Sequence, residues 1–469
     1  MSHVNIWDYV GKRVHMVGIG GSSMSGLAQM LHTDGFAVSG SDRDEGYALN
    51  KLRGLGIPVY AGHDPERAAQ ADLLIYSAAI SPQDPERVAA LDKGIPQVER
   101  AELLGQLMRG YRQTACVCGT HGKTTASSML AQILLDAGQD PTIHIGGLLD
   151  YIGGGSRVGG KGVFVAEACE FNRSFLHMPP TIAIITNIEE DHLDCYRDLD
   201  DIESAFQQFV DLLPADGLCV GLADDPRVMR VMQRSGRRYI SFSLTGAADW
   251  TADGLRYDEH GCAAFDALYR GERRGHVTLQ VAGDFNALHA LAALAAAVEL
   301  GVPFEVGSRS LASFVNPHRR FEYTGTVQGM RLYHDYGHNP AEMQSAVGVA
   351  ALQGRRVIAV MQPHTYSRVK GLFEGFLTCT RAADITLVTD IYAAREVDPG
   401  DIHSRMLIEG MRAHGIDAHL TPTFDDTERW LLQNGRDGDL VLTMGCGNIN
   451  LLNDQMQRHW DEQHQPLEG

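Results

Sequence analysis

One short segment constrains the fold of this chain more than any other: it runs from Gly119 to Thr125 and reads Gly-Thr-His-Gly-Lys-Thr-Thr. The apolar residues 114–117 before it are typical of a buried strand, and residues 126–135 after it repeat apolar side chains at helical spacing. A strand, a glycine turn, a Lys-Thr pair and a helix bind polyphosphate, because the N–H groups and the dipole at the helix start attract anions. The sequence therefore predicts a nucleotide-binding domain of the α/β class.

In such a loop Lys123 reaches the outer phosphates, and the hydroxyl group of Thr124 can hold Mg²⁺. The full pattern would have glycine at the position of Val117. The alternative is a surface turn with an incidental Gly-Lys-Thr sequence. Because the strand and the helix stand in the right places, the nucleotide-binding interpretation is favoured.

The size and composition of the chain limit the classes of function. Its 469 residues are enough for about three domains, and 44% hydrophobic with 21% charged residues is typical of a folded protein. The formal charge of −19 argues against nucleic acid or an anionic membrane as a partner. The eight cysteines form no C-x-x-C pair, and no signal peptide or membrane-spanning run is recognisable. We therefore expect a cytoplasmic protein with reduced thiols.

A second glycine turn occurs near the N-terminus, at residues 18–21, and the strand that follows it ends at Asp42. This spacing fits a dinucleotide-binding fingerprint, but Ser23 replaces the third glycine, so the signal for NAD is weak. A nucleotide diphosphate ligand is favoured over a mere tight turn. Ser77 also follows a predicted strand, at the end where α/β folds place ligand contacts.

Polar side chains follow two predicted strands of the central region. Glu167 ends one strand and His192 follows another, which is the placement that Mg²⁺ coordination requires. For Glu190 and Asp194 a solvated loop charge is the favoured alternative. Farther along, residues 286 and 289 are Asn and His, one helical turn apart; a polar first turn of a helix explains them equally well.

A third α/β region begins near Ser313, with further buried strands expected at residues 357–361, 385–390 and 440–445. The pair Arg319 and Arg320 lies near the start of this region and suits bidentate phosphate contact, although a surface salt bridge is an equal alternative.

These motifs, taken together and in order, resemble those of the Mur ligases, the amide ligases of peptidoglycan synthesis. The resemblance covers Val14 to about Ile449 and rests on eleven short motifs: Gly18-Ile19-Gly20-Gly21, Ser39-Gly40-Ser41-Asp42, Gly119 to Thr125, Glu167-Ala168-Cys169-Glu170, Thr186-Asn187-Ile188-Glu189, Asp191-His192-Leu193-Asp194, Arg319-Arg320-Phe321-Glu322, Asp335-Tyr336-Gly337-His338, Gln362-Pro363-His364, Asp390 to Ala394 and Gly445-Cys446-Gly447-Asn448.

The resemblance implies three α/β domains: a Rossmann-like domain for the UDP-substrate (1–112), a central P-loop ATPase domain with a mostly parallel sheet (113–313), and a Rossmann-like C-terminal domain that closes over ATP and the amino acid (314–469). It implies that ATP and Mg²⁺ serve to join L-alanine to the carboxylate of UDP-N-acetylmuramic acid through an acyl phosphate. The expected partners are these small molecules alone, and the chain is expected to be a monomer or a homodimer.

The resemblance also assigns residues. It implies UDP contacts at Gly20, Gly21, Ser22, Ser23, Asp42 and Ser77; metal ligands at Thr124, Glu167 and His192; catalytic roles for Lys123, His192, His338 and Arg368; and nucleotide contacts at Gly119, Thr120, His121, Gly122, Lys123, Thr124, Thr125, Asn286, His289, Arg320 and Asp335.

Some positions differ from the common family pattern, notably Ser23, Phe285, His334, Asn339 and Thr365. Because His334 and Thr365 were expected near the amino-acid site, the identity of the added amino acid stays open. The alternatives are a ligase that adds glycine or serine, or one that recycles murein tripeptide. From other classes, a nucleotide-binding sensor and an NAD-binding oxidoreductase also remain.

Overall fold

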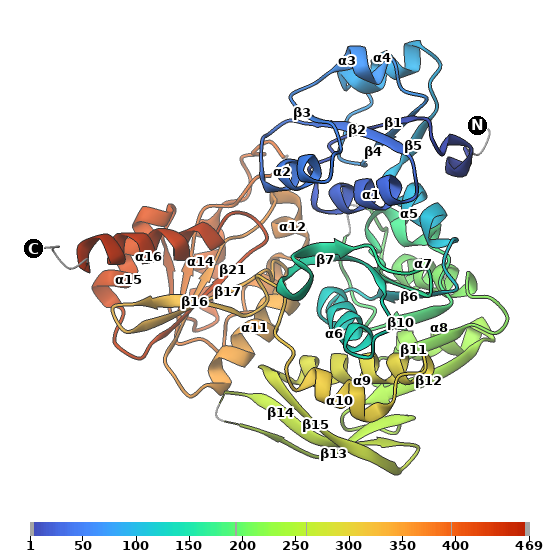
Figure 1. The fold of residues 1–469 in the computed structure, drawn as a ribbon. Helices are drawn as coiled ribbons and strands as arrows, with labels where there is room; N and C mark the ends of the chain where they lie inside the picture. The colour runs from blue at the N-terminus through green and yellow to red at the C-terminus, as the bar shows by residue number, and fades with distance from the viewer. Residues whose placement is uncertain (1–3, 193–194, 259, 395, 465–469) are drawn as a thin grey trace, which may run out of the picture. The chain divides into compact units, whose positions relative to one another are not determined.

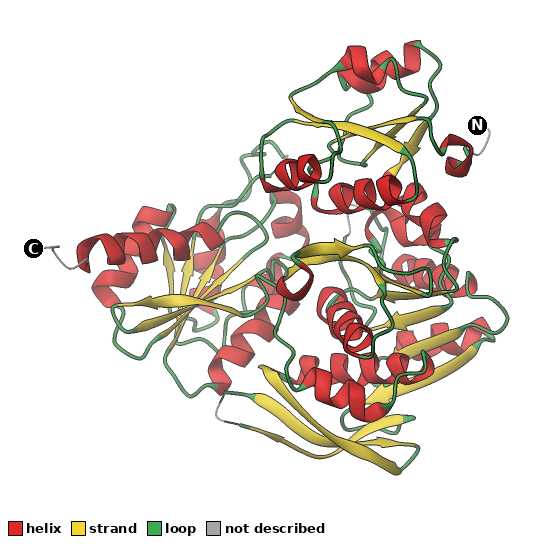
Figure 2. Cartoon of the chain, in the orientation of Figure 1, coloured by secondary structure: helices red, strands yellow, loops and turns green. Residues whose placement is uncertain are grey.

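The computed structural model describes residues 4–192, 195–258, 260–394 and 396–464, and it contains three separate β-sheets with helices between the strands (Figures 1 and 2). The predicted α/β class with a mostly parallel central sheet is confirmed. By its contacts the chain divides into two compact units. The first unit is Met1–Asp253, Asp266–Val277 and Ala287–Ser313, and the second unit is Gly254–Phe265, Thr278–Asn286 and Phe314–Gly469. The limits of the three domains stay a prediction.

The N-terminal sheet has the strand order β3-β2-β1-β4-β5, and every pairing in it is parallel. Helices α1 and α2 cover one face of this sheet, and α3 and α4 cover the other (Figure 1). The order reverses between β1 and β4, and in such sheets a ligand crevice lies outside the carboxyl ends of the strands at that point. Its elements are β1 (Arg13–Val17), α1 (Ser22–Thr33), β2 (Ala37–Asp42), α2 (Tyr47–Gly54), β3 (Val59–Ala61), α3 (Pro65–Ala68), β4 (Leu73–Tyr76), α4 (Pro85–Asp92), β5 (Gln97–Glu99) and α5 (Arg100–Met108).

The central sheet has ten strands in the order β15-β14-β13-β12-β11-β10-β6-β9-β7-β8. Strand β6 is parallel to both of its neighbours, β10 and β9, so the segments that follow these three strands emerge at one edge. The elements are β6 (Gln113–Cys118), α6 (Lys123–Asp136), β7 (Thr142–Leu149), β8 (Gly154–Arg157), β9 (Val163–Glu167), β10 (Ile182–Ile185), α7 (Leu199–Asp211), β11 (Leu218–Leu222), α8 (Pro226–Ser235), β12 (Arg238–Ser243), β13 (Trp250–Tyr257), β14 (Cys262–Tyr269), β15 (Glu272–Ala282), α9 (Asp284–Glu299) and α10 (Phe304–Leu311).

The core of the central sheet explains why its sequence lacks polar alternation. Residues 115–118 of β6 are all fully buried, and so are most side chains of α6. Parallel strands are covered by helices on both faces and therefore read as continuous apolar runs.

The third sheet has the order β16-β17-β21-β18-β19-β20, in which an antiparallel hairpin, β16–β17, extends a set of parallel strands. Apolar clusters fill both of its faces. The elements are β16 (Glu322–Val327), β17 (Met330–Asp335), α11 (Pro340–Leu352), β18 (Val357–Met361), α12 (Tyr366–Gly371), α13 (Phe373–Phe376), β19 (Ile385–Val388), α14 (Ser404–Ala413), β20 (Ala418–Leu420), α15 (Phe424–Asn434), β21 (Leu440–Met444) and α16 (Asn450–His464). Throughout the described ranges, the helices all fall short of the length and apolar character needed to cross a bilayer.

Candidate active site

The loop between β6 and α6 adopts a conformation that two of its residues can reach only as glycines. Gly119 has a φ of +139° and Gly122 a φ of +81°, which side chains rarely adopt. A Cβ atom at Gly119 would overlap the hydroxyl oxygen of Thr186, and one at Gly122 would overlap the ring of His289. The loop is therefore packed closely from two sides.

The segment after β10 holds this loop in place. The N–H of His121 donates to the side-chain oxygen of Asn187 (2.8 Å), and the Asn187 amide donates back to the His121 carbonyl (3.2 Å). The hydroxyl of Thr186 donates to the same carbonyl (2.5 Å). Neither Thr186 nor Asn187 was among the predicted site residues. The signal in the sequence was the abrupt change from apolar to polar residues at the end of β10.

Lys123 forms an ion pair with Glu170, to which the sequence analysis assigned no role. Its Nζ is 2.9 Å from Oε2 of Glu170 and donates to the carbonyl oxygens of Gly119 (2.7 Å) and Thr120 (3.0 Å). Burial alone would lower the pKa of Lys123, but the Glu170 carboxylate outweighs it and the pKa is raised. Burial would raise the pKa of Glu170, yet the charge of Lys123 and the contact with His192 bring it below its ordinary value. Both groups are therefore charged.

The predicted metal ligands contact one another or this ion pair. The hydroxyl of Thr124 donates to Oε2 of Glu167 (3.0 Å), which also accepts from the N–H of Gly146 (2.9 Å). His192 has a φ of +53°, and its Nε2 is 3.5 Å from Oε1 of Glu170. A hydroxyl and a carboxylate beside a helix start are oxygen ligands of the kind Mg²⁺ takes, so Thr124 and Glu167 fit this ion. Asp194, for which a solvated loop charge was favoured, lies outside the described residues.

The glycine turn after β1 is held by the end of β2. The carbonyl of Ser41 accepts hydrogen bonds from Gly18 (2.8 Å) and Ile19 (2.9 Å), and the carboxylate of Asp42 accepts from the N–H of Gly20 (2.8 Å). Asp42 thus shapes the turn directly, while Gly21 is the residue before the first turn of α1, which starts at Ser22. Ser77 follows β4, which pairs with β1, so its predicted place beside the turn agrees with the topology.

Ser23, which replaces the third glycine of the dinucleotide-binding pattern, has a structural role. Its Oγ is 2.8 Å from Nε2 of His144 on β7 and accepts a hydrogen bond from Arg100 (3.2 Å). His144 is buried, and its Nδ1 is 3.0 Å from the hydroxyl of Ser156. Burial, with a smaller effect of Arg100, lowers the pKa of His144 to about 3, so the ring is neutral. The Ser23 side chain joins α1 to the central sheet. Its predicted contact with the UDP moiety stays a prediction.

Two predicted nucleotide contacts lie three residues apart on α9. Asn286 is 1% exposed; its amide nitrogen donates to the Ala282 carbonyl (2.7 Å), and its side-chain oxygen has no hydrogen-bond partner among the described residues. A buried acceptor of this kind suits the amino group of a base, because leaving it unpaired costs free energy. His289 is also buried and stands against Gly122 of the phosphate loop.

In the second unit the two neighbouring arginines have different surroundings. Arg319 donates to Nε2 of His334 (3.0 Å) and to the carbonyls of Gly445 (3.1 Å) and Gly447 (3.0 Å), so it ties β17 to the segment after β21. The guanidinium groups of both arginines lie over the ring of Tyr336, 4.8 Å (Arg319) and 5.2 Å (Arg320) from its centroid. Arg319 is therefore structural, and Arg320 is the better candidate for a phosphate contact, as predicted.

Backbone N–H groups hold the carboxylate of Asp335, a predicted nucleotide contact, in place. Its two carboxylate oxygens accept hydrogen bonds from Gly337 (2.7 Å) and Phe321 (2.9 Å). Burial raises the pKa of Asp335, although Arg320 and the two N–H groups oppose this. A carboxylate held in this way keeps one orientation, which suits contact with ribose hydroxyl groups.

A histidine cluster in the second unit contains both predicted catalytic residues of this region. The rings of His338 and His364 have centroids 6.1 Å apart, and Arg368 is 3.0 Å from Nδ1 of His364. Burial and the Arg368 charge lower the pKa of His364 to about 4, so this ring is neutral at pH 7. The structure thus brings His338 and Arg368 together through His364, a residue that lay in a quoted motif without an assigned role.

The structure also shows the surroundings of Asn339, His334 and Thr365, which differ from the common family pattern. The side-chain oxygen of Asn339 accepts from the N–H of Glu342 (3.0 Å) and so caps α11. His334 is buried, with Nδ1 3.0 Å from the hydroxyl of Thr443 and Nε2 accepting from Arg319. Thr365 has a φ of +63° and precedes α12. At least Asn339 and His334 therefore serve the fold.

Comparison with known families agrees with this geometry along most of the chain. Residues 13–112 match a family model described as "Mur ligase family, catalytic domain", residues 117–297 match "Mur ligase middle domain", and residues 319–447 match "Mur ligase, glutamate ligase domain".

Among curated relatives, a UDP-N-acetylmuramate–L-alanine ligase of Acetivibrio thermocellus is 44% identical over 441 residues, covering 93% of this chain and 94% of that protein. A ligase of the same name from Caldanaerobacter subterraneus is 42% identical over 439 residues, covering 93% and 95%.

Solved structures agree. A UDP-N-acetylmuramate–alanine ligase of Thermotoga maritima superposes with a TM-score of 0.81 at 25% identity, covering 96% of this chain and 100% of that one. A murein peptide ligase of Psychrobacter arcticus, at 23% identity, shares the fold with a TM-score of 0.71, covering 96% and 98%. The chain belongs to the Mur ligase family.

Proposed function

We propose that this protein is an ATP-dependent ligase that joins L-alanine to the carboxylate of UDP-N-acetylmuramate in peptidoglycan precursor synthesis. The observation that carries the proposal is the phosphate loop with its charged Lys123–Glu170 pair and the Thr124–Glu167 contact beside it. Relatives at 42–44% identity that carry the name of this activity, and that align along 93% of this chain, support the choice of substrates.

The chemistry follows from the weakness of a carboxylate as an acyl donor. Transfer of the γ-phosphoryl group of ATP to the substrate carboxylate gives an acyl phosphate, whose phosphate is a good leaving group. The neutral amine of alanine then attacks the carbonyl carbon and expels phosphate. No enzyme nucleophile is needed, and burial raises the pKa of the Cys169 thiol, next to Glu170 in the sequence, to about 11, so this thiol stays protonated.

In this proposal the phosphate loop binds the phosphates of ATP. Lys123 and the N–H groups at the start of α6 hold the β- and γ-phosphates, and Asn286 with His289 contacts the adenine. Thr124 and Glu167 would hold one Mg²⁺, and His192 would bind or support a second metal ion; such ions supply positive charge against the charge of the phosphoryl group in transfer. The protein's own task is positioning and charge neutralisation.

The remaining roles are proposals as well. The glycine turn, with Gly20, Gly21, Ser22, Ser23, Asp42 and Ser77, would bind the UDP moiety. Arg320 and Asp335 would bind phosphate and ribose of ATP, and His338 and Arg368 would face the reacting carboxylate or the alanine. We further propose that the protein works in the cytoplasm, as a monomer or a homodimer.

The contacts of His334 bear on which amino acid the protein adds. His334, one of the two departures that left it open, is buried between Arg319 and Thr443 and is used by the fold. That position therefore gives no reason to prefer glycine, serine or a tripeptide over alanine.

The proposal is tested by phosphate release from ATP with UDP-N-acetylmuramate and a panel of L-alanine, glycine, L-serine and murein tripeptide, with product masses measured. We expect release to require both substrates, to be fastest with L-alanine, and to be lost in Lys123→Ala. Release without an amino acid, or a product mass that shows tripeptide addition, would overturn it. Binding of NAD(H) in place of turnover would support the oxidoreductase alternative.

A further inference from the structure

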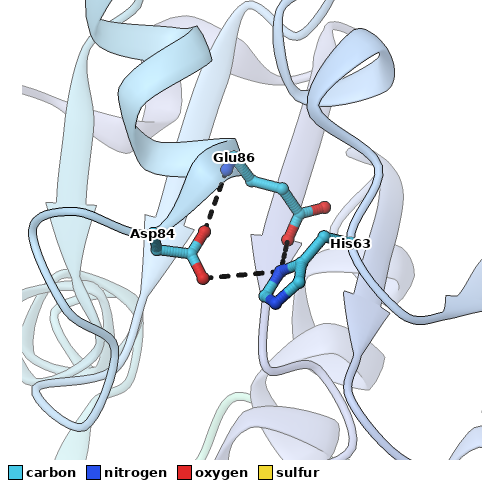
Figure 3. Close-up of side chains that lie close together, drawn as sticks. All are labelled: His63, Asp84 and Glu86. Atoms are coloured by element: carbon cyan, nitrogen blue, oxygen red, sulfur yellow. Dashed lines mark hydrogen bonds and ion pairs between the residues drawn. The ribbon is translucent and has the colours of Figure 1, made fainter.

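A cluster of metal-ligating side chains lies in the N-terminal sheet region, away from the phosphate loop. It consists of His63 after β3, and Asp84 and Glu86 at the start of α4 (Figure 3). One ligand atom from each residue lies within 4.8 Å of the other two. His63 is exposed, the Asp84 carboxylate is largely buried, and Glu86 is fully buried. The cluster therefore opens to solvent on the side of the histidine alone.

The distances in this cluster differ from those of ordinary hydrogen bonds. Nδ1 of His63 is 3.5 Å from Oδ2 of Asp84 and 3.7 Å from Oε2 of Glu86. Hydrogen bonds between nitrogen and oxygen have lengths of about 2.7–3.2 Å. In a tetrahedral site with bonds of about 2.0–2.2 Å, neighbouring ligand atoms lie about 3.3–3.6 Å apart. The spacing around His63 is thus closer to that of ligands sharing one ion.

Both carboxylates are held in position by other groups. Oε1 of Glu86 accepts from the N–H of Asp64 (3.0 Å) and lies 3.1 Å from Nε2 of the buried His15. The hydroxyl of Ser41 donates to Oε2 (2.5 Å). Oδ1 of Asp84 caps α4 by accepting from the N–H of Glu86 (2.9 Å), so that Oδ2 is the oxygen directed at His63. Such supporting contacts orient metal ligands in known sites.

The acidic groups of the cluster also favour a cation. Asp84 and Glu86 bring two carboxylates to one place, beside the half-exposed imidazole of His63. Carboxylate oxygens and an imidazole nitrogen are both ligands that a Zn²⁺-type ion takes.

We propose that His63, Asp84 and Glu86 bind one divalent transition-metal ion of the Zn²⁺ type, through Nδ1 of the histidine and one oxygen of each carboxylate. One imidazole and two carboxylates suit Zn²⁺ and its neighbours better than Mg²⁺, whose ligands are mostly oxygens. Three protein ligands leave the fourth position to water on the exposed side.

Bound metal would join the β3–α3 loop to the start of α4. Glu86 also connects this site to the glycine turn, because the Ser41 that donates to it accepts the hydrogen bonds of Gly18 and Ile19 through its carbonyl. The ion would therefore stabilise the edge of the sheet that carries the proposed UDP site.

The test is a calorimetric titration of the full-length protein with Zn²⁺ in the presence of excess Mg²⁺, which occupies the proposed magnesium site. The variants are His63→Ala and Asp84→Asn; the second keeps an oxygen that can cap α4. The matched control is His32→Ala, because His32 is an exposed histidine of α1 outside the cluster. Visible absorption of the Co²⁺-substituted protein reports the geometry, and neither readout depends on ligase activity.

We expect the wild-type protein and His32→Ala to bind one Zn²⁺ at this site and to show the intense visible bands of tetrahedral Co²⁺. Both cluster variants should bind that ion at least about 100-fold more weakly and lose the bands. Equal Zn²⁺ stoichiometry and affinity in wild type and His63→Ala, or no Zn²⁺ binding by the wild type, would overturn the proposal. Circular dichroism and thermal unfolding confirm that each variant is folded.

Discussion

Nζ of Lys123 lies 2.9 Å from the buried carboxylate of Glu170, and the other oxygen of the same carboxylate lies 3.5 Å from Nε2 of His192. Glu170 therefore links the residue proposed to hold phosphates with a residue proposed to hold metal. Because it is 2% exposed, its charge depends on these neighbours. The ion pair orients Lys123, and it also means that the buried charge of Glu170 is compensated only while Lys123 is present.

Replacing Lys123 by alanine should therefore impair both activity and stability. Loss of the charge at the phosphates should reduce kcat at least about 100-fold. Loss of the partner leaves Glu170 buried and uncompensated, which should lower the free energy of unfolding by about 3–5 kcal/mol. Phosphate release and urea unfolding measure the two effects separately.

The control for this experiment is the double variant Lys123→Ala with Glu170→Gln. It removes both charges, so most of the lost stability should return while the activity stays absent. If Lys123→Ala proves as stable as the wild type, the pair has no role in stability and the argument is wrong.

Glu167→Gln should change how activity depends on Mg²⁺. The carboxylate accepts from Thr124 and from the N–H of Gly146, so a neutral amide loses one ligand charge. We expect the Mg²⁺ concentration for half-maximal activity to rise about 10- to 100-fold, with stability little changed. Initial rates across a Mg²⁺ series measure this. Glu190→Gln, at an exposed position, is the matched control, and an equal shift in both variants would contradict a ligand role for Glu167.

Much of the fold and part of the site could be predicted because they depend on local pattern. The glycine loop before α6 and the carboxylate at the end of β9 are readable from strand, turn and helix signals, and the structure places Glu167 against Thr124. Glu170 could not be assigned in this way. It is followed by a turn in which Asn172 and Arg173 have positive φ values, and only the folded path of that turn directs its carboxylate at Lys123.

The same limit applies to neighbouring residues of one type. Nothing in the sequence distinguishes Arg319 from Arg320, and both lie over the ring of Tyr336. Arg319 in addition makes three hydrogen bonds to distant parts of the second unit. Likewise, Asn339 differs from the family pattern because it caps α11. Tertiary contacts decide these roles, and periodicity carries no information about them.

The buried His334 should make stability depend on pH. Burial, aided by the charge of Arg319, lowers its pKa to about 3, whereas an unfolded chain has a histidine pKa near 6.5. Between these two pKa values the histidine is protonated in the unfolded state and neutral in the folded state. This histidine therefore leaves the free energy of unfolding unchanged above about pH 6.5 and lowers it as the pH drops toward 3.

Urea unfolding at several pH values between 7 and 4 tests this. In His334→Asn the decline in the free energy of unfolding should become shallower by up to about 1.4 kcal/mol per pH unit, because one fewer proton is taken up on unfolding. His144, whose pKa is also lowered to about 3, should maintain part of the decline. The exposed His32→Asn should follow the wild-type curve, and a His334→Asn curve parallel to the wild type would contradict the assignment.

Gly122→Ala should disrupt the phosphate loop more than its backbone conformation alone explains. Gly122 and Gly138, which stand at opposite ends of α6, both have positive φ, +81° and +71°. A Cβ at Gly122 would overlap the ring of His289, whereas at Gly138 nothing lies within 4 Å. Gly138→Ala should therefore cost only the strain of a left-handed residue, about 1–2 kcal/mol, and keep full activity. Gly122→Ala should cost more and also raise the KM for ATP, because His289 or the loop must move. Thermal unfolding and ATP kinetics of the two variants decide the matter: equal losses of stability with unchanged KM would show that the contact between Gly122 and His289 does not position the loop.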